Sequence, residues 1–119
     1  MVESKNSKPY DLGERTLGFA RDVISVVNGL PKTMANVEVA RQVIRSAGSV
    51  GANYIEANEA FGKKDFAFRF KICRKEAKET KFWLRLFEAK NKSVGAVESL
   101  IGEAEELTKI FNAIAEKSK

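Results

Sequence analysis

The sequence predicts an all-α protein, an up-and-down antiparallel four-helix bundle. Four stretches of the 119-residue chain carry apolar residues at the spacing of an amphipathic helix. The two prolines, Pro9 and Pro31, lie outside these stretches, and no stretch of comparable length alternates as a strand does. Short turns favour packing of each helix against its sequence neighbour. We expect one domain over residues 10–117, preceded by a flexible segment at residues 1–9.

The first half of the chain predicts two helices. The first begins near Asp11, which has capping-box spacing to Glu14, and stops at Asn28-Gly29. The second runs from about residue 35 to residue 60. Their apolar positions are Leu17, Ala20, Val23, Ile24 and Val27, then Val39, Val43, Val50, Tyr54, Ala57 and Phe61. Gly48 and Gly51 would let a neighbouring helix pack closely, offsetting a cost of about 1 kcal/mol for each glycine.

The second half predicts two more helices after a break at residues 61–64. The third spans about residues 65–89, and Asn91-Lys92-Ser93 and Gly95 end it. The fourth has nearly heptad spacing. Their apolar positions are Phe66, Phe70, Cys73, Ala77, Leu84 and Phe87, then Val97, Leu100, Ile101, Ala104, Leu107, Phe111 and Ile114.

Composition excludes several classes of protein. Cys73 is the only cysteine, so the chain has no internal disulfide and no cysteine-rich metal site, and we interpret Cys73 as a buried packing residue. The absence of histidine removes the commonest general base and metal ligand. The polar start and the lack of a long apolar run predict neither a signal peptide nor a membrane anchor. We therefore expect a cytoplasmic protein without a cofactor.

The positive charge is concentrated in one segment. Residues 61–90 hold ten basic and four acidic residues, whereas the whole chain has a net charge of +5. Eight of these cations fall within a wedge of roughly 120° opposite the apolar face of the third helix. They are Lys63, Lys64, Lys71, Arg74, Lys75, Lys78, Lys81 and Arg85. One interpretation is a solvated face paired with acids such as Glu103, Glu105 and Glu106. The other is a phosphate-binding ridge for RNA or DNA.

Three apolar residues lie beside or within that basic wedge. They are Phe68, Phe82 and Leu86. Apolar side chains on the outer face of a bundle commonly mark an interface, so we expect contact with another subunit. Stacking on exposed bases is the alternative.

Polar residues border the apolar faces of the second and third helices. They are Arg45, Ser49, Asn53, Glu56, Glu76 and Glu79. Buried polar groups need partners, so we expect a structural network that fixes helix register. Glu56-x-x-Glu59 and Glu76-x-x-Glu79 also resemble the acidic constellation with which all-α nucleotide pyrophosphohydrolases hold magnesium. A di-iron carboxylate site is disfavoured, because its Glu-x-x-His motifs need histidine.

Residues 42–57 resemble the central signature of the bacterial four-helix-bundle proteins encoded in intervening sequences of 23S ribosomal RNA genes. Arg45 and a run of small residues precede Ser49-Val50, and Asn53-Tyr54-Ile55-Glu56 follows. Leu30-Pro31, residues 66–70 and residues 75–84 are similar to the same pattern, so the resemblance covers about residues 10–115. The chain departs from it at Glu56-Ala57, where the family often has Glu-Gly, and at Arg74-Lys75, where it has Gly-Ser.

The resemblance implies a bundle that assembles into a ring, typically a pentamer, with no established enzymatic activity. The chain is also similar to the basic accessory variability protein of diversity-generating retroelements, which is thought to bind nucleic acid and a reverse transcriptase. We therefore expect a non-enzymatic homo-oligomer that binds RNA or DNA, with a protein partner as a further expectation. The alternatives are a purely structural or protein-interaction oligomer and a magnesium-dependent nucleotide pyrophosphohydrolase.

Overall fold

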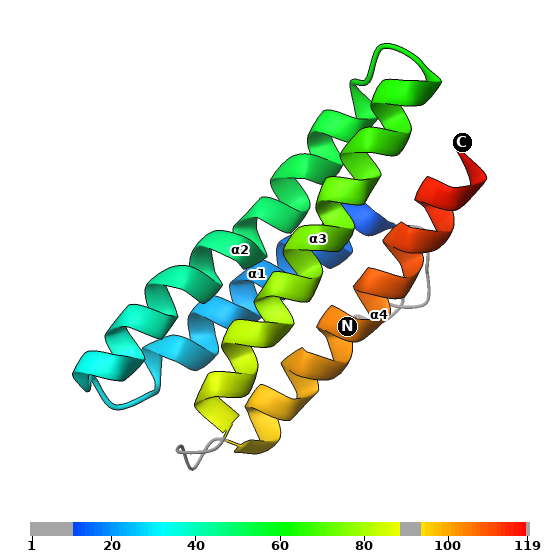
Figure 1. Ribbon diagram of the computed structural model, residues 1–119. Helices are drawn as coiled ribbons and strands as arrows, with labels where there is room; N and C mark the ends of the chain where they lie inside the picture. The colour runs from blue at the N-terminus through cyan, green and yellow to red at the C-terminus, as the bar shows by residue number, and fades with distance from the viewer. Residues whose placement is uncertain (1–10, 89–93, 119) are drawn as a thin grey trace.

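The computed structural model describes residues 11–88 and 94–118, and these form four antiparallel helices (Figure 1). The helices are α1 (Leu12–Asn28), α2 (Met34–Asn58), α3 (Lys63–Glu88) and α4 (Val94–Lys117). The predicted all-α four-helix bundle is therefore confirmed. The segment at residues 1–9 and the turn residues 91–93 lie outside the described residues. None of the described helices is long and apolar enough to cross a membrane.

Local interactions set where the helices begin and end. The Asp11 carboxylate accepts a hydrogen bond of 3.2 Å from the Glu14 backbone N–H, which confirms the predicted cap of α1. Thr33 caps α2 in the same way, at 3.0 Å from the Asn36 N–H. The turn into α3 passes through Gly62 at a φ of +127°, a conformation that favours glycine. With this tight turn, α2 ends about two residues earlier than predicted, and α3 also begins about two residues earlier than predicted.

The core follows the predicted arcs of α2, α3 and α4. Val97, Ala104, Leu107 and Phe111 of α4 are fully buried, which confirms the heptad-like spacing. The Phe111 ring lies 5.9 Å, centroid to centroid, from the ring of Phe70 on α3. Helix α3 packs closely against both α2 and α4, whereas α1 packs mainly against α2 and only lightly against α4.

Three residues that were expected on apolar arcs are exposed. Leu17 and Ile24 of α1 are 44% and 43% exposed, and Phe61 is 98% exposed. Because α1 packs mainly against α2, its buried side centres on Phe19 and Val23, and Leu17 and Ile24 lie at the outer edge. Phe61 is exposed because α2 ends at Asn58, which places Phe61 in the turn and not on the helical arc.

The two glycines in the middle of α2 have different surroundings. A Cβ atom at Gly51 would lie 3.1 Å from the Thr16 Oγ1 atom of α1, so this position is one of close helix approach. A Cβ atom at Gly48 would meet no heavy atom within 4 Å. Only Gly51 therefore provides the close packing that both were expected to allow within the bundle.

We expect these glycines to respond in opposite ways to larger side chains. Gly51→Leu should lower the free energy of unfolding by about 1–3 kcal/mol, because the side chain would push α1 away from α2. Gly48→Ala should raise it by about 0.5–1 kcal/mol, because alanine is the better helix former. Urea denaturation at matched protein concentration measures both values. A lower free energy of unfolding for Gly48→Ala would contradict the open surroundings of this position.

Candidate nucleic-acid interface

The eight basic residues of the predicted wedge form a ridge along the outer side of α3, here called the basic ridge. Six of them are exposed, and Arg74 and Lys81 are partly buried at the border with α4. The Arg74 guanidinium donates a hydrogen bond of 2.5 Å to the Asn112 side-chain oxygen. Lys81 Nζ lies 2.7 Å from a Glu105 carboxylate oxygen, and this hydrogen bond holds the pKa of Glu105 below its usual value. These two cations help to attach α3 to α4.

Most of the ridge is not neutralised by neighbouring acids. Lys63, Lys64, Lys71, Lys78 and Arg85 form no ion pair with the residues that the structure describes. Lys75 Nζ lies 3.8 Å from a Glu76 carboxylate oxygen. The ridge therefore presents five cations in one row that form no ion pair among the described residues, although Arg85 also helps to lower the pKa of Glu105.

The acids expected to pair with the ridge are mostly engaged elsewhere. Glu103 accepts two hydrogen bonds, of 2.6 and 2.8 Å, from Arg15 of α1. Its carboxylate raises the pKa of the Arg15 guanidinium, mainly through these bonds. Glu106 lies 3.9 Å from Lys109 on its own helix. Of the three, only Glu105 pairs with the ridge among the residues that the structure describes.

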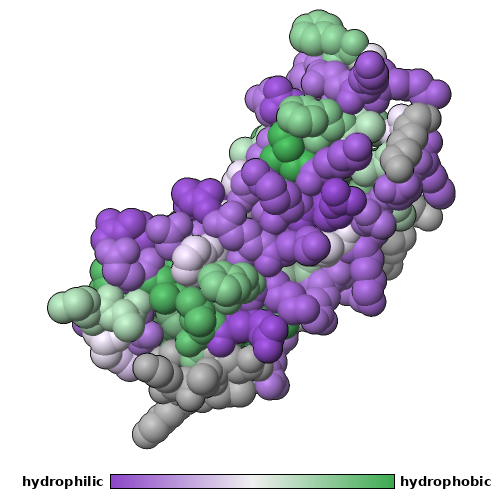
Figure 2. Space-filling view, viewed as in Figure 1, coloured by the Kyte–Doolittle hydropathy of each residue, from purple (hydrophilic) through white to green (hydrophobic). Residues whose placement is uncertain are grey.

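The three apolar residues beside the ridge lie in two separate places. Phe82 and Leu86, which are 56% and 47% exposed, lie in the C-terminal part of α3. The Phe82 ring packs edge-on against Trp83, with centroids 5.0 Å apart. Phe68, also 56% exposed, lies near the start of α3 among lysines. Figure 2 shows the corresponding pattern, with hydrophobic side chains gathered toward the two ends of the α2–α3 face and hydrophilic ones between them.

A second apolar surface runs along the outer edge of α1 and α2, and sequence reasoning missed it. This apolar stripe consists of Leu17, Ile24, Val37, Ile44 and Ile55, which are 37–62% exposed. Val37, Ile44 and Gly51 recur at seven-residue intervals and therefore lie on one side of α2. Gly51 contacts α1, so this is the side of α2 that borders α1. Two signals could have revealed it, namely this second heptad spacing on α2 and the width of the apolar arc on α1.

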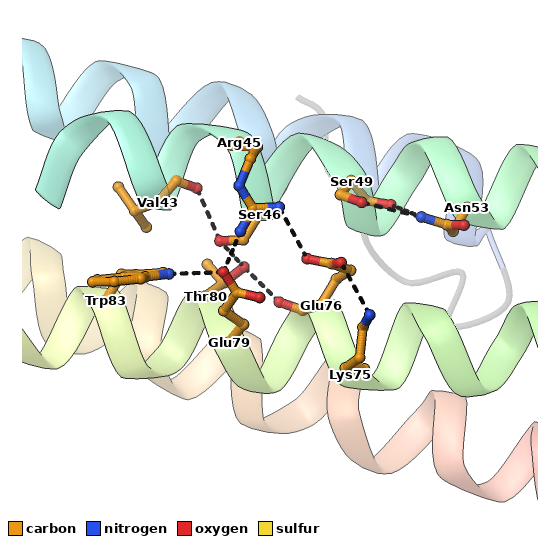
Figure 3. Close-up of polar contacts among 10 residues, drawn as sticks. All are labelled: Val43, Arg45, Ser46, Ser49, Asn53, Lys75, Glu76, Glu79, Thr80 and Trp83. Atoms are coloured by element: carbon orange, nitrogen blue, oxygen red, sulfur yellow. Dashed lines mark hydrogen bonds and ion pairs between the residues drawn. The ribbon is translucent and has the colours of Figure 1, made fainter. Parts of the chain in front are cut away.

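The polar residues between α2 and α3 form two groups (Figure 3). Arg45 of α2 reaches across to α3, where its guanidinium hydrogen-bonds to Glu79 and lies 3.8 Å from a Glu76 carboxylate oxygen. Glu79 also accepts a hydrogen bond of 2.9 Å from the Trp83 indole N–H. Separately, the Asn53 side-chain amide donates to the Ser49 carbonyl and hydroxyl oxygens, at 2.9 and 3.1 Å.

A buried pair of hydroxyls joins the same two helices and was not predicted. Thr80 and Ser46 are both fully buried, and the Thr80 hydroxyl lies 2.9 Å from the Ser46 hydroxyl oxygen. Thr80 also donates toward the Glu76 carbonyl at 2.8 Å. Such a pair is hard to predict from sequence, because the hydroxyl of a Ser or Thr in a helix can instead hydrogen-bond to a backbone carbonyl of the preceding turn.

Glu56 does not join either polar group. Its side chain is exposed and makes no hydrogen bond or ion pair with the described residues, whereas its backbone carbonyl accepts the Glu59 N–H at the end of α2. Glu76 and Glu79 are held by Arg45, and no three acidic or cysteine side chains in the described part of the chain could together hold a metal ion. The two Glu-x-x-Glu motifs therefore do not converge on one site. Cys73 is fully buried, which raises the pKa of its thiol to about 12 and leaves it unsuited to act as a nucleophile near neutral pH.

We expect Arg45→Met to lower the free energy of unfolding by about 1 kcal/mol. The substitution removes the cation between two glutamates, of which Glu76 is buried, but the half-exposed position of Arg45 limits the effect through solvent screening. Arg41→Met is the matched control, because Arg41 is exposed and lies 3.8 Å from Glu38 on its own helix. Equal effects of the two substitutions in urea denaturation would argue against a register-fixing role for Arg45.

Comparisons with known proteins agree with this architecture. The model of a family described as 23S rRNA-intervening sequence protein matches residues 10–113. A crystal structure of a protein of unknown function from the S23 ribosomal protein family of Bacteroides thetaiotaomicron is 28% identical, with a TM-score of 0.77. The match covers 87% of this chain and 96% of that chain. No curated protein matches the chain. These matches indicate no enzyme family.

Proposed function

The chain belongs to the 23S rRNA-intervening sequence protein family, and from this premise we propose that it is a non-enzymatic, self-associating bundle that binds RNA or DNA through the basic ridge of α3. The observation that carries the proposal is the row of five cations on the ridge that form no ion pair in the described part of the chain. Cations elsewhere are more often paired, as Arg15 is with Glu103 and Arg69 is with Asp65. A row of unpaired cations favours a polyanionic ligand.

The spacing of the ridge suits a nucleic-acid backbone. Lys71, Lys75 and Lys78 follow one another at four- and three-residue intervals, so they lie on successive turns of α3. Each lysine can neutralise one phosphate and release its condensed counterions. Such contacts do not read sequence, so we propose binding that depends strongly on salt and weakly on base order.

The apolar surfaces support self-association. A head-to-tail contact between copies needs two different, complementary patches on each chain, and a ring forms when successive contacts close. The apolar stripe on α1 and α2 is one patch, and Phe82 with Leu86 is the other. We propose that these two patches meet between neighbouring copies in a ring, for which the family resemblance implies a pentamer.

A purely structural or protein-interaction oligomer is the second candidate. The apolar stripe favours it, because exposed apolar side chains gathered on one edge need a protein surface and not a phosphate backbone. The two candidates differ in one measurable property, the salt-sensitive binding of nucleic acid. Sedimentation of the protein with labelled structured RNA at about 50 and 200 mM salt tests the proposal, since several phosphate contacts should change affinity by orders of magnitude over that range.

A further inference from the structure

The end of the bundle where α2 turns into α3 carries exposed aromatic rings among lysines. Phe61 in the turn is 98% exposed, and Phe68 on the second turn of α3 is 56% exposed. Lys63 and Lys64 lie between them in the chain, and Lys71 follows one turn after Phe68. A nearly fully exposed phenylalanine contributes almost nothing to the core, so the fold gives no reason for the Phe61 ring.

Two open cavities at this end are lined by lysines. One, of about 460 Å³, is lined by Lys63, Lys64, Ala67, Phe68, Lys71 and Ser118. The other, of about 440 Å³, is lined by Ala60, Gly62, Lys63, Phe66, Lys117 and Ser118. Lys63 and Ser118 border both, so the cavities adjoin each other, and neither has an acidic residue among these lining residues. The lining of these two cavities is therefore complementary in charge to phosphate groups.

The acid in the first turn of α3 does not offset these lysines. One Asp65 carboxylate oxygen accepts a hydrogen bond of 3.2 Å from the Phe61 backbone N–H. The other lies 3.8 Å from the Arg69 guanidinium. Asp65 thus holds the turn that carries Phe61, and Arg69 compensates its charge. The lysines lining the cavities stay available to an external anion.

We propose that this end of the bundle binds a single-stranded segment of nucleic acid, with phosphates on Lys63, Lys64 and Lys71 and bases stacked on Phe61 and Phe68. The inference rests on the proposed function and deepens it by naming the form of the ligand. Lysines alone do not distinguish strands from duplexes, because both present phosphates. An exposed phenyl ring does, because its face can stack only on a base that has left the duplex stack.

The middle of α3 lacks this second element. Between Phe68 and Phe82 the exposed positions carry Lys71, Lys75 and Lys78, which can contact a backbone but offer no aromatic face. Phe82 packs against Trp83 and lies beside Leu86, in the patch assigned above to self-association. In this proposal the bases are contacted at one end of the ridge and the phosphate backbone is contacted along its middle.

The test compares an oligothymidylate with an abasic oligomer of the same length, which keeps the phosphates and lacks the bases. The wild-type protein is expected to bind the oligothymidylate at least roughly thirtyfold more tightly than the abasic oligomer, because base–aromatic stacking contributes about 1–3 kcal/mol per base and two rings are available. In the double variant Phe61→Leu and Phe68→Leu, the ratio of the affinities for the two oligomers should fall to about one. Leucine keeps an apolar side chain but has no flat ring on which a base can stack. The double variant Phe61→Trp and Phe68→Trp should retain the wild-type affinity ratio, because the indole ring can also stack on a base.

The outcomes separate this inference from the proposed function. A ratio near one in the wild-type protein, or an unchanged ratio in the leucine variant, would overturn the stacking inference while salt-sensitive binding of the abasic oligomer still supported the ridge. A leucine variant that changes the sedimentation of the protein but not the ratio would assign the rings to a protein contact and also overturn the inference. Binding of structured RNA without binding of either oligomer would overturn the single-strand inference alone. Failure of the wild-type protein to bind either oligomer or the structured RNA would remove the proposed function itself.

Discussion

Reversing Lys71, Lys75 and Lys78 to glutamate is expected to weaken RNA binding by at least about two orders of magnitude. Each reversal removes one phosphate contact and replaces it with a charge that repels the backbone. The three side chains are exposed in the middle of the basic ridge, so the far-ultraviolet circular dichroism should stay helical. Fluorescence anisotropy with a labelled structured RNA measures the change in affinity.

The control reverses three exposed cations that lie off the ridge, Arg21, Lys32 and Arg41. Each reversal changes the charge by two, so both triple variants have a net charge of −1 in place of +5. The control variant should lose much less affinity than the ridge variant, because a local row of cations makes the contacts. Equal losses would show that net charge alone drives the binding. Unchanged binding in the ridge variant would remove the ridge from the interface.

Disrupting either apolar patch is expected to dissociate the oligomer completely. Ile24→Glu with Ile44→Glu places two charges in the apolar stripe, and the antiparallel register set by Thr16 against Gly51 brings these positions level with each other. Phe82→Glu with Leu86→Glu does the same to the patch on α3. All four side chains are 37–56% exposed, so the bundle of each variant should remain folded. Each variant alone should sediment as a monomer.

Mixing the two variants separates a head-to-tail contact from a symmetric one. In a head-to-tail contact, the intact α3 patch of one variant can meet the intact stripe of the other, and the damaged patches prevent any further growth. The mixture should therefore form a heterodimer and nothing larger. A mixture that stays monomeric would contradict the head-to-tail arrangement and favour a contact in which each patch meets its own copy.

Much of the fold could be predicted from local sequence. The Asp11 cap and the heptad-like spacing of α4 each correspond to a physical requirement that acts within one helix. The positions of Leu17 and Ile24 could not be predicted in this way. Periodicity marks them as apolar, but their exposure follows from α1 packing mainly against α2, which is a property of the whole bundle. The same packing exposes the apolar stripe.

The positive charge of the candidate site could be predicted from the sequence, but the acidic residues that pair with it could not. The basic ridge follows directly from helical projection of one segment. Which acid reaches it depends on how α4 rotates against α3, and that rotation aims Glu105 at Lys81 while Glu103 pairs with Arg15. Phe61 was expected on the apolar arc, because the sequence places the break at residues 61–64 and does not show that α2 already ends at Asn58. The shorter helix is what frees the ring for the role inferred above.

The most direct test of the account is sedimentation velocity of the wild-type protein, alone and with labelled structured RNA, at about 50 and 200 mM salt. We expect an oligomer that carries RNA at the lower salt and releases it at the higher salt, while the oligomer itself persists. Persistence is expected because the contacts between copies are apolar and the contacts with RNA are ionic. An oligomer that ignores RNA at both salt concentrations would contradict the nucleic-acid function, and a monomer would contradict the assembly.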